Sequence, residues 1–235
     1  MRPVVIEYRF ELPDKLPACF VLTFDATTMA PLTSVSEPLP FWAQLDFHRC
    51  PHCPLQASEV PNCPAAERLA DLLAWSSALV SHESLRLTVV TPERTTVADT
   101  TAQRAVSSLM GLIMATSGCP YSAFLRPMAR FHLPLSSEAE TIYRAASMYL
   151  LAQYFVERQG RPADMKLQAL QGHYENLHRV NLSLCQRMRA AVTQDSSVNA
   201  VIVLDCFAKA LPATIEEALC ELEPLFHSYL NRPAP

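Results

Sequence analysis

Four of the eight cysteines, Cys50, Cys53, Cys63 and Cys119, are each followed directly by proline. With 19 prolines among 235 residues, chance would place a proline after fewer than one of eight cysteines. Cys50 and Cys53 stand three positions apart, a spacing with which one loop turns two thiolates toward the same metal ion. The sequence therefore predicts that these four cysteines together form a metal or cluster site.

Four thiolates can bind either a tetrahedral zinc ion or an iron–sulfur cluster, and the sequence leaves both open. Pro54 stands where zinc knuckles usually have glycine, and the chain has no second Cys-x-x-Cys, which weakens the case for zinc. Proline often follows iron–sulfur ligands, which supports a cluster. A third and less favoured hypothesis is haem bound through an exposed Cys-Pro thiolate. If one cysteine is not used, the reserve ligands are His48, His52 and His132.

The simpler alternative is that Cys50 and Cys53 form a surface turn and that the other two cysteines are incidental. A thioredoxin-like redox pair is less favoured, because that motif opens a helix and Pro54 is followed by a loop pattern. The cysteines that no proline follows lie in apolar segments, and we expect them to pack in the core: Cys19, Cys185, Cys206 and Cys220.

The positions of Cys63 and Cys119 differ in their expected effect on a thiolate. Cys63 directly precedes Pro64, so it should lie at a helix N-terminus, where the helix dipole stabilises a negative charge. Cys119 follows Gly118, which should end another helix. A thiolate there is disfavoured unless a cation is close by.

A second group of polar residues follows Cys119 in a proline-punctuated segment. Arg126, Arg130 and His132 could bind an anion or a partner's carboxylate. The alternative, slightly favoured, is structural: the arginines pair with Glu138, Glu140 or helix carbonyls, and His132 is a satisfied buried side chain.

The elements that would position these residues change type along the chain. Alternating apolar residues predict strands over 4–12, 20–24 and 41–47, and a strand over 85–90 that turns and returns through Val97. Helices are expected over 64–80 and 101–118, then from a Ser137/Glu140 capping box to Gly160, and from Asp164 to about 192. A last helix should begin at a Thr214/Glu217 capping box and be kinked or broken at Pro224.

This order predicts an α+β fold, in which a mostly antiparallel sheet packs against a helical bundle. We expect a single domain over 1–235, with a strand-rich part over 1–99 that contains the cysteine loop and a helical part over 100–235.

The helix expected after Asp164 carries a stripe of residues in alternating steps of three and four, with Asn181 at the equivalent of a coiled-coil a position. A lone Asn there fixes register and partner number, so a homodimer is one hypothesis. An ordinary bundle helix is the favoured alternative, since only about three heptads are present. The stripe comprises Leu167, Leu170, Tyr174, Leu177, Asn181, Leu184 and Met188.

Composition narrows the class of protein. Half of the residues are hydrophobic, 18% are charged, and the net charge is −4, with 7 basic and 12 acidic side chains in residues 1–100 against 12 and 11 in the rest. No Lys/Arg cluster suits a nucleic-acid backbone, and no apolar run is long enough for a membrane span. With no signal-peptide pattern, the chain is expected in the cytoplasm, where thiols stay reduced and favour metal ligation over disulfides.

Five segments resemble an uncharacterised family of bacterial conserved hypothetical proteins. They are Cys-Pro-His-Cys-Pro-Leu (50–55), Asn-Cys-Pro (62–64), Gly-Leu-Ile-Met-Ala-Thr-Ser-Gly-Cys-Pro (111–120), Pro-Met-Ala-Arg-Phe-His-Leu-Pro (127–134) and Tyr-Leu-Leu-Ala-Gln-Tyr-Phe (149–155). The resemblance covers about residues 40–210 and implies a bacterial cytoplasmic protein of one conserved unit, with no activity attached.

The resulting hypothesis is a metal-stabilised protein with a non-catalytic binding or regulatory role. Its partner would be an unidentified protein or small molecule, and neither a nucleic acid nor a membrane. The alternative is an iron–sulfur or thiol-dependent redox protein that uses the same cysteines. Whether the protein is an enzyme stays open from the sequence.

Overall fold

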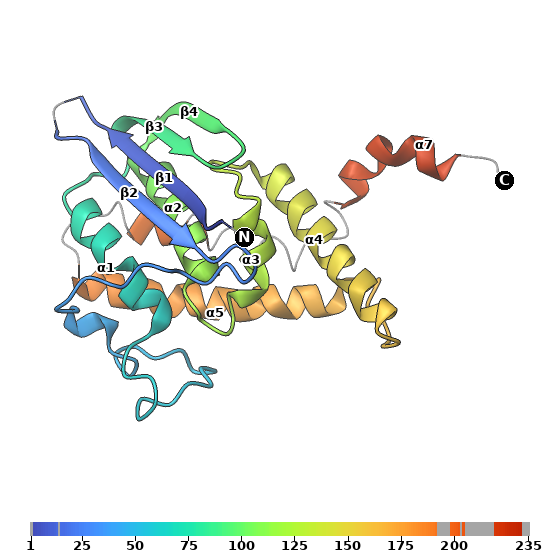
Figure 1. The fold of residues 1–235 in the computed structure, drawn as a ribbon, viewed down its shortest axis with the longest axis horizontal. Helices are drawn as coiled ribbons and strands as arrows, with labels where there is room; N and C mark the ends of the chain where they lie inside the picture. The colour runs from blue at the N-terminus through green and yellow to red at the C-terminus, as the bar shows by residue number, and fades with distance from the viewer. Residues whose placement is uncertain (1, 14, 192–197, 203, 205–218, 232–235) are drawn as a thin grey trace.

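The chain folds as an antiparallel sheet followed by helices, which confirms the α+β prediction (Figure 1). The computed structural model describes residues 2–13, 15–191, 198–202, 204 and 219–231. Its four strands lie in the order β2-β1-β3-β4, and every neighbouring pair is antiparallel. They are β1 (Val4–Glu11), β2 (Ala18–Phe24), β3 (Ser84–Val90) and β4 (Thr95–Thr101).

One face of the sheet is buried because apolar side chains alternate with polar ones along the central strands. In β1, Ile6, Tyr8 and Phe10 are at most 1% exposed, while Arg9 between them faces solvent. Tyr8 pairs with Phe20 in β2 and with Val89 in β3. The period of two read from the sequence thus fixes which face meets the helices.

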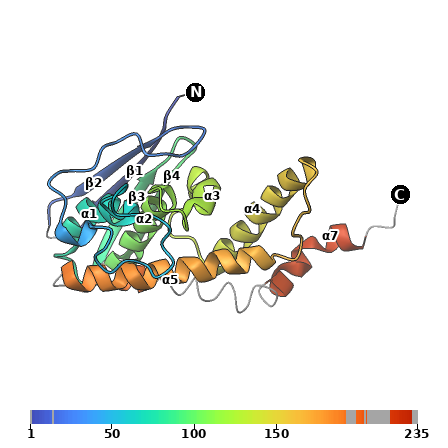
Figure 2. The same ribbon diagram turned by 90° about the horizontal axis from the view of Figure 1, so that it is seen from below.

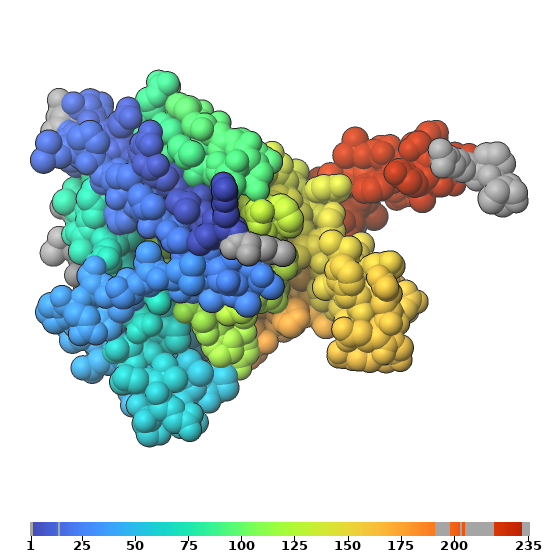
Figure 3. Space-filling model, in the orientation of Figure 1, coloured from blue at the N-terminus to red at the C-terminus, as the bar shows by residue number. Residues whose placement is uncertain are grey.

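The helices form two further layers behind the buried face. Figure 2 shows the sheet, then the pair α1 and α2, and then the long α5. Figure 3 shows α4 and the C-terminal helical segment projecting away from this body. The α-helices are α1 (Pro64–Ser76), α2 (Ala102–Thr116), α3 (Arg126–Arg130), α4 (Glu138–Arg158), α5 (Gln168–Ala191) and α7 (His227–Leu230), and the short 3-10 helices are η1 (Phe41–Ala43), η2 (Ala123–Leu125) and η3 (Glu223–Phe226).

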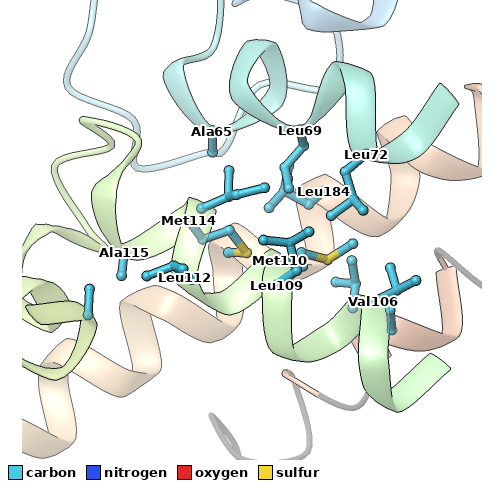
Figure 4. Packing of buried hydrophobic residues seen from close by; sticks show 14 of the residues in the cluster. Ala65, Leu69, Leu72, Val106, Leu109, Met110, Leu112, Met114, Ala115 and Leu184 are labelled. Carbon is cyan, nitrogen blue, oxygen red and sulfur yellow. The ribbon is translucent and has the colours of Figure 1, made fainter. Parts of the chain in front are cut away.

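The core between α1, α2 and α5 is made of aliphatic and methionine side chains (Figure 4). Leu69 and Leu72 of α1 meet Met110 of α2 and Leu184 of α5, and all four are at most 2% exposed. Burying each such side chain contributes roughly 1.5–3 kcal/mol to folding. This core holds α2 and α5, the two helices that position most of the polar residues discussed below.

The strand predicted over 41–47 is wrong. Phe41–Ala43 is a 3-10 turn, and an isolated bridge joins Gln44 to Asn62. Further hydrogen bonds run from Leu45 N–H to Pro61 O (2.8 Å) and from Cys63 N–H to Ala43 O (2.8 Å). Part of the backbone of this segment thus bonds with its own returning end instead of with the sheet.

Several predicted helix boundaries shift. The helix after Asp164 begins at Gln168, because Leu167 has a positive φ of 61° and the Asp164 carboxylate accepts hydrogen bonds from the Lys166 and Ala169 N–H groups. The helix over 64–80 ends at Ser76. The Ser137/Glu140 capping box is present as predicted.

At the C-terminal end of the chain, the helix predicted from Thr214 is described only in part. The Thr214/Glu217 capping box lies outside the described residues. Pro224 lies within the 3-10 turn η3, between helical residues on either side, so the predicted break is present.

The stripe on α5 packs inside the chain. Leu170, Tyr174, Asn181, Leu184 and Met188 are each at most 4% exposed. The helix is thus the ordinary bundle helix of the favoured alternative. The stripe gives no support to a homodimer, which stays an untested prediction. Among the residues that the structure describes, no helix combines the length and apolarity needed to cross a membrane.

Candidate metal centre

The structure brings Cys50, Cys53, Cys63 and Cys119 to the wall of one small cavity of about 20 Å³. Three segments supply them: the loop after η1, the start of α1 and the residues that follow α2. The remaining wall includes apolar side chains and two polar residues of α5, Ser183 and Arg187. Whether the four cysteines bind a metal stays a prediction, but they do share one location.

The Cys50–Cys53 loop is a tight turn that other residues hold in place. Cys53 N–H donates to Cys50 O at 3.0 Å, and the Arg49 guanidinium donates to Cys53 O at 3.2 Å and to Leu55 O. The Tyr121 hydroxyl donates to His52 O at 2.5 Å, which joins this loop to the segment that carries Cys119. Two of the cysteine-bearing segments are therefore linked directly.

Cys63 and Cys119 approach each other through their neighbours. Cys63 is the N-cap of α1 with Pro64 at the first helical position, as predicted, so its thiol lies at the positive end of a 13-residue helix. Gly118 has φ of 95°, a left-handed conformation that glycine adopts without strain. A Cβ built on Gly118 would lie 3.9 Å from Pro64 Cβ, so the segment around Gly118 lies close to the first residue of α1.

Arg187 closes the cavity from α5 and is only 1% exposed. Its Nη1 donates to Trp42 O (2.5 Å) and Gln44 O (2.7 Å), and its Nη2 donates to Leu45 O (2.9 Å). Burial lowers the pKa of the Arg187 guanidinium, while the nearby Cys63, Cys50 and Cys53 thiols raise it. Among the described residues it forms no ion pair with a carboxylate, and these thiols would supply the opposite charge only if they were ionised.

Burial holds two of the thiols, Cys50 and Cys119, against ionisation. Burial raises the pKa of Cys119 to about 11, partly offset by hydrogen bonds from the Tyr121 and Ser122 backbone. Burial also raises the pKa of Cys50, and a hydrogen bond with the Ser183 side chain lowers it. The Arg187 charge favours the thiolate form of Cys50 as well. A bound cation would supply the further stabilisation that the thiolates need.

In the described part of the chain, no three His, Cys, Asp or Glu side chains are arranged closely enough to hold a metal ion as they stand. All seven described cysteines are free thiols. The prediction of core packing is right for Cys185, which is buried, and wrong for Cys19 and Cys220, which are exposed. Cys19 lies on the solvent side of β2, where its thiol donates to Glu7 Oε1 at 3.1 Å. Cys206 lies outside the described residues.

The three reserve histidines do not line the cavity. His52 is the nearest in sequence, but its Nε2 is 3.2 Å from Asn176 O and its ring packs on Tyr121, with centroids 4.2 Å apart. His48 packs edge-on against Phe47. His132 lies in another part of the molecule, beside Tyr8 of β1.

The structure does not bring Arg126, Arg130 and His132 to one site. Arg130 forms an ion pair with Glu93 at 2.9 Å, and Arg126 Nε is buried without a partner among the described residues. His132 Nε2 is hydrogen-bonded to the Tyr8 hydroxyl. His132 is therefore the satisfied side chain of the structural alternative, although it is only partly buried, and Arg130 pairs with a different carboxylate from those expected.

Sequence reasoning missed two arginines, Arg187 at the cysteines and Arg144 beside His132. A signal for Arg187 existed, since it follows Leu184 by three residues and directly precedes Met188, both in the buried stripe. A charged residue at the edge of a buried helix face requires a buried partner. Arg144 gave no such signal, because its contacts are the Met128 and Phe131 carbonyls.

No curated protein and no solved structure matches this chain. A family model described as "Domain of unknown function (DUF6901)" matches residues 6–227, which include all four cysteines and both arginines. This match covers most of the chain and agrees with the resemblance to an uncharacterised family. The protein belongs to the family of the domain of unknown function DUF6901.

Proposed function

We propose that Cys50, Cys53, Cys63 and Cys119 bind a metal that joins the cysteine loop, α1 and the end of α2, in a protein with a non-catalytic binding or regulatory role. The observation that carries this proposal is the buried charge of Arg187 next to thiols rather than carboxylates. Removing a guanidinium from water is costly unless an opposite charge lies close by.

A metal–thiolate centre would provide that opposite charge. Four thiolates around one divalent cation carry a formal net charge of −2, which the Arg187 cation partly neutralises. Neutral thiols would leave Arg187 with only the three backbone carbonyls that it now contacts. If the cysteines are ionised, their negative charge therefore explains the buried Arg187, and Arg187 in turn stabilises the thiolates.

The surroundings of the cavity favour a structural role. Leu45, Leu55, Val180 and Leu184 line it together with the cysteines, and Cys119 is 8% exposed. Catalytic zinc sites keep a position open for water or substrate, whereas structural sites are closed by four protein ligands. Four thiolates in an apolar, enclosed cavity match the closed type.

Zinc is the preferred metal because the cavity is small. About 20 Å³ is room for one water-sized body, which corresponds to a single ion. The sulfurs would have to close in to the Zn–S distance of about 2.3 Å. The iron–sulfur alternative, with a redox role, is favoured by a different feature, the proline that follows each of the four cysteines.

The test is elemental analysis combined with an absorption spectrum of the full-length protein purified without oxygen. We expect about one zinc per chain and no visible colour. Single substitutions Cys50→Ser, Cys53→Ser, Cys63→Ser and Cys119→Ser should each lower the zinc content. The matched control is Cys19→Ser, which removes an exposed thiol on the sheet and should keep the zinc.

Two results would change the conclusion in different ways. A brown protein that contains iron and sulfide would replace zinc by the iron–sulfur alternative at the same four cysteines. A metal-free protein that unfolds at the same temperature before and after zinc is added would overturn the metal centre itself.

A further inference from the structure

A second and larger cavity, of about 200 Å³, lies between α2, α3, α4 and α5. None of the four cysteines lines it. Its walls are mostly aliphatic and include Leu112, Ala115, Met128 and Leu177. In Figure 4, Leu112 and Ala115 lie apart from the α1 side chains, so this part of α2 does not serve the core contact with α1. The cavity is thus an apolar chamber bounded by four helices.

The polar groups of this chamber include Arg144, Tyr174 and His132. Arg144 uses one nitrogen, Nη2, to donate to Met128 O (2.9 Å) and Phe131 O (2.8 Å). Among the described residues its Nη1 has no hydrogen-bond partner, and no carboxylate lies within ion-pair distance. The guanidinium can therefore still bind an anion.

Tyr174 offers a second donor close to Arg144. It is 4% exposed, and within the described chain its hydroxyl makes no hydrogen bond. The hydroxyl is not among the described buried polar atoms that lack a partner, so it is reached from the chamber and is open to a ligand. The Arg144 charge lowers the pKa of Tyr174, against the larger effect of burial, so the two groups interact electrostatically. A ligand oxygen that bridges them would satisfy both.

His132 adds no positive charge to the chamber. Burial and, to a smaller extent, the Arg144 charge lower its pKa to about 3, so it is neutral at physiological pH. Its Nε2 is already hydrogen-bonded to the Tyr8 hydroxyl, which also lies 2.8 Å from Ser108 Oγ. Arg144 is therefore the partly buried cation of the chamber, since the other arginine of the lining, Arg104, is exposed.

We propose that this chamber binds a small carboxylic acid whose apolar body fills the aliphatic part and whose carboxylate is held by Arg144 and Tyr174. Arginine suits a carboxylate because its planar fork can donate two parallel hydrogen bonds. The size is also defined, since an apolar cavity of about 150 Å³ accommodates benzene. A chamber of about 200 Å³ suits one substituted aromatic ring or a short branched chain.

The experiment compares three probes of the same shape by titration calorimetry on the full-length protein: 4-ethylbenzoate, 4-ethylbenzyl alcohol and 4-ethylbenzylamine. We expect the carboxylate to bind with one site per chain and at least tenfold more tightly than the alcohol, because a hydrogen bond to a charged group is worth about 1.5–3 kcal/mol. The amine should bind most weakly, because Arg144 repels it. Equal binding of carboxylate and alcohol, or no binding of any probe, would overturn the proposal.

Three variants connect the binding to this chamber. Tyr174→Phe breaks no hydrogen bond of the structure, so it should fold normally and bind the carboxylate roughly five- to tenfold more weakly, with the alcohol unaffected. Ala115→Phe should fill the chamber and abolish binding. Arg130→Gln, which alters an arginine paired with Glu93 outside the chamber, is the control.

Unchanged carboxylate binding in both Tyr174→Phe and Ala115→Phe would place the site elsewhere and refute the proposal. Because these residues lie outside the cysteine cavity, zinc content should be the same in all variants. Failure here is therefore separate from failure of the metal centre.

Discussion

Tyr121 and His52 connect the two segments that carry most of the candidate ligands. The Tyr121 hydroxyl donates to His52 O at 2.5 Å, and the two rings lie with centroids 4.2 Å apart. His52 stands between Cys50 and Cys53, and Tyr121 follows Cys119 by two residues. This one contact thus limits how far the Cys-x-x-Cys loop can move from Cys119.

Replacing Tyr121 with Phe should loosen this connection. The substitution keeps the ring packing and removes one hydrogen bond, so the free energy of unfolding should fall by about 1 kcal/mol. Chemical denaturation of protein purified without oxygen measures this change. Tyr154→Phe, at a half-exposed ring on α4, is the control and should have no effect. An equal loss of unfolding free energy in both variants would show that the hydrogen bond between Tyr121 and His52 does not stabilise the fold.

Arg187→Gln should be far more damaging. It leaves the carbonyls of Trp42, Gln44 and Leu45 without their donor and removes the cation next to the thiols, so we expect a loss of roughly 3–5 kcal/mol in unfolding free energy. Zinc content, measured on the fraction that remains folded, should fall as well. Arg189→Gln changes an exposed arginine of the same helix and should alter neither quantity. Full zinc content in the folded Arg187→Gln variant would show that the arginine does not contribute to metal binding.

Local patterns in the sequence predicted local structure well. The alternation in β1 and the Ser137/Glu140 capping box each involve residues a few positions apart, and both are present. The same kind of pattern failed over 41–47, where alternating Phe41, Ala43 and Leu45 resemble a strand. There the backbone bonds with its own returning end at Asn62 and with the side chain of Arg187, both far along the chain.

The candidate site, like the fold, was predicted from the sequence only in part. The sequence identified four unusual cysteines, and Cys63 is the helix N-cap that Pro64 predicted. It could not show that α5 closes their cavity, because Arg187 is far from the cysteines in sequence. Its partners are backbone carbonyls, which every residue type has and which therefore leave no signal in the sequence. For the same reason Arg126 and Arg130, close to Cys119 and His132 in sequence, were grouped with His132 although Arg144 is the arginine beside it.

Thiol labelling should distinguish the cysteines. With iodoacetamide at neutral pH and without oxygen, the exposed Cys220 should react faster than Cys19, because burial and the hydrogen bond to Glu7 raise the pKa of Cys19. If the cavity binds zinc, the half-buried Cys53 and Cys63 should stay unlabelled until a chelator is added. Mass spectrometry of peptides gives the extent at each residue. Rapid labelling of Cys53 and Cys63 before chelation would contradict a bound metal.

The burial of His132 should make stability depend on pH in a defined direction. Burial lowers its pKa to about 3 in the folded protein, against about 6.5 in an unfolded chain. Between these values the unfolded chain binds a proton that the folded protein does not. The contribution of His132 to the free energy of unfolding is therefore fully present above about pH 6.5. It falls as the pH decreases, by up to about 1.4 kcal/mol per pH unit.

His132→Gln should remove this dependence while keeping a polar group near the Tyr8 hydroxyl. The measurement is urea denaturation at several values between pH 7 and pH 4.5, and the quantity of interest is the difference between wild type and variant, in which the titration of the shared carboxylates cancels. That difference should change by about 1.4 kcal/mol per pH unit below pH 6. His82→Gln, at an exposed histidine, should follow the wild type. If His132→Gln runs parallel to the wild type across the range, His132 accepts a proton in the folded protein and the chamber beside Arg144 is more polar than its lining indicates.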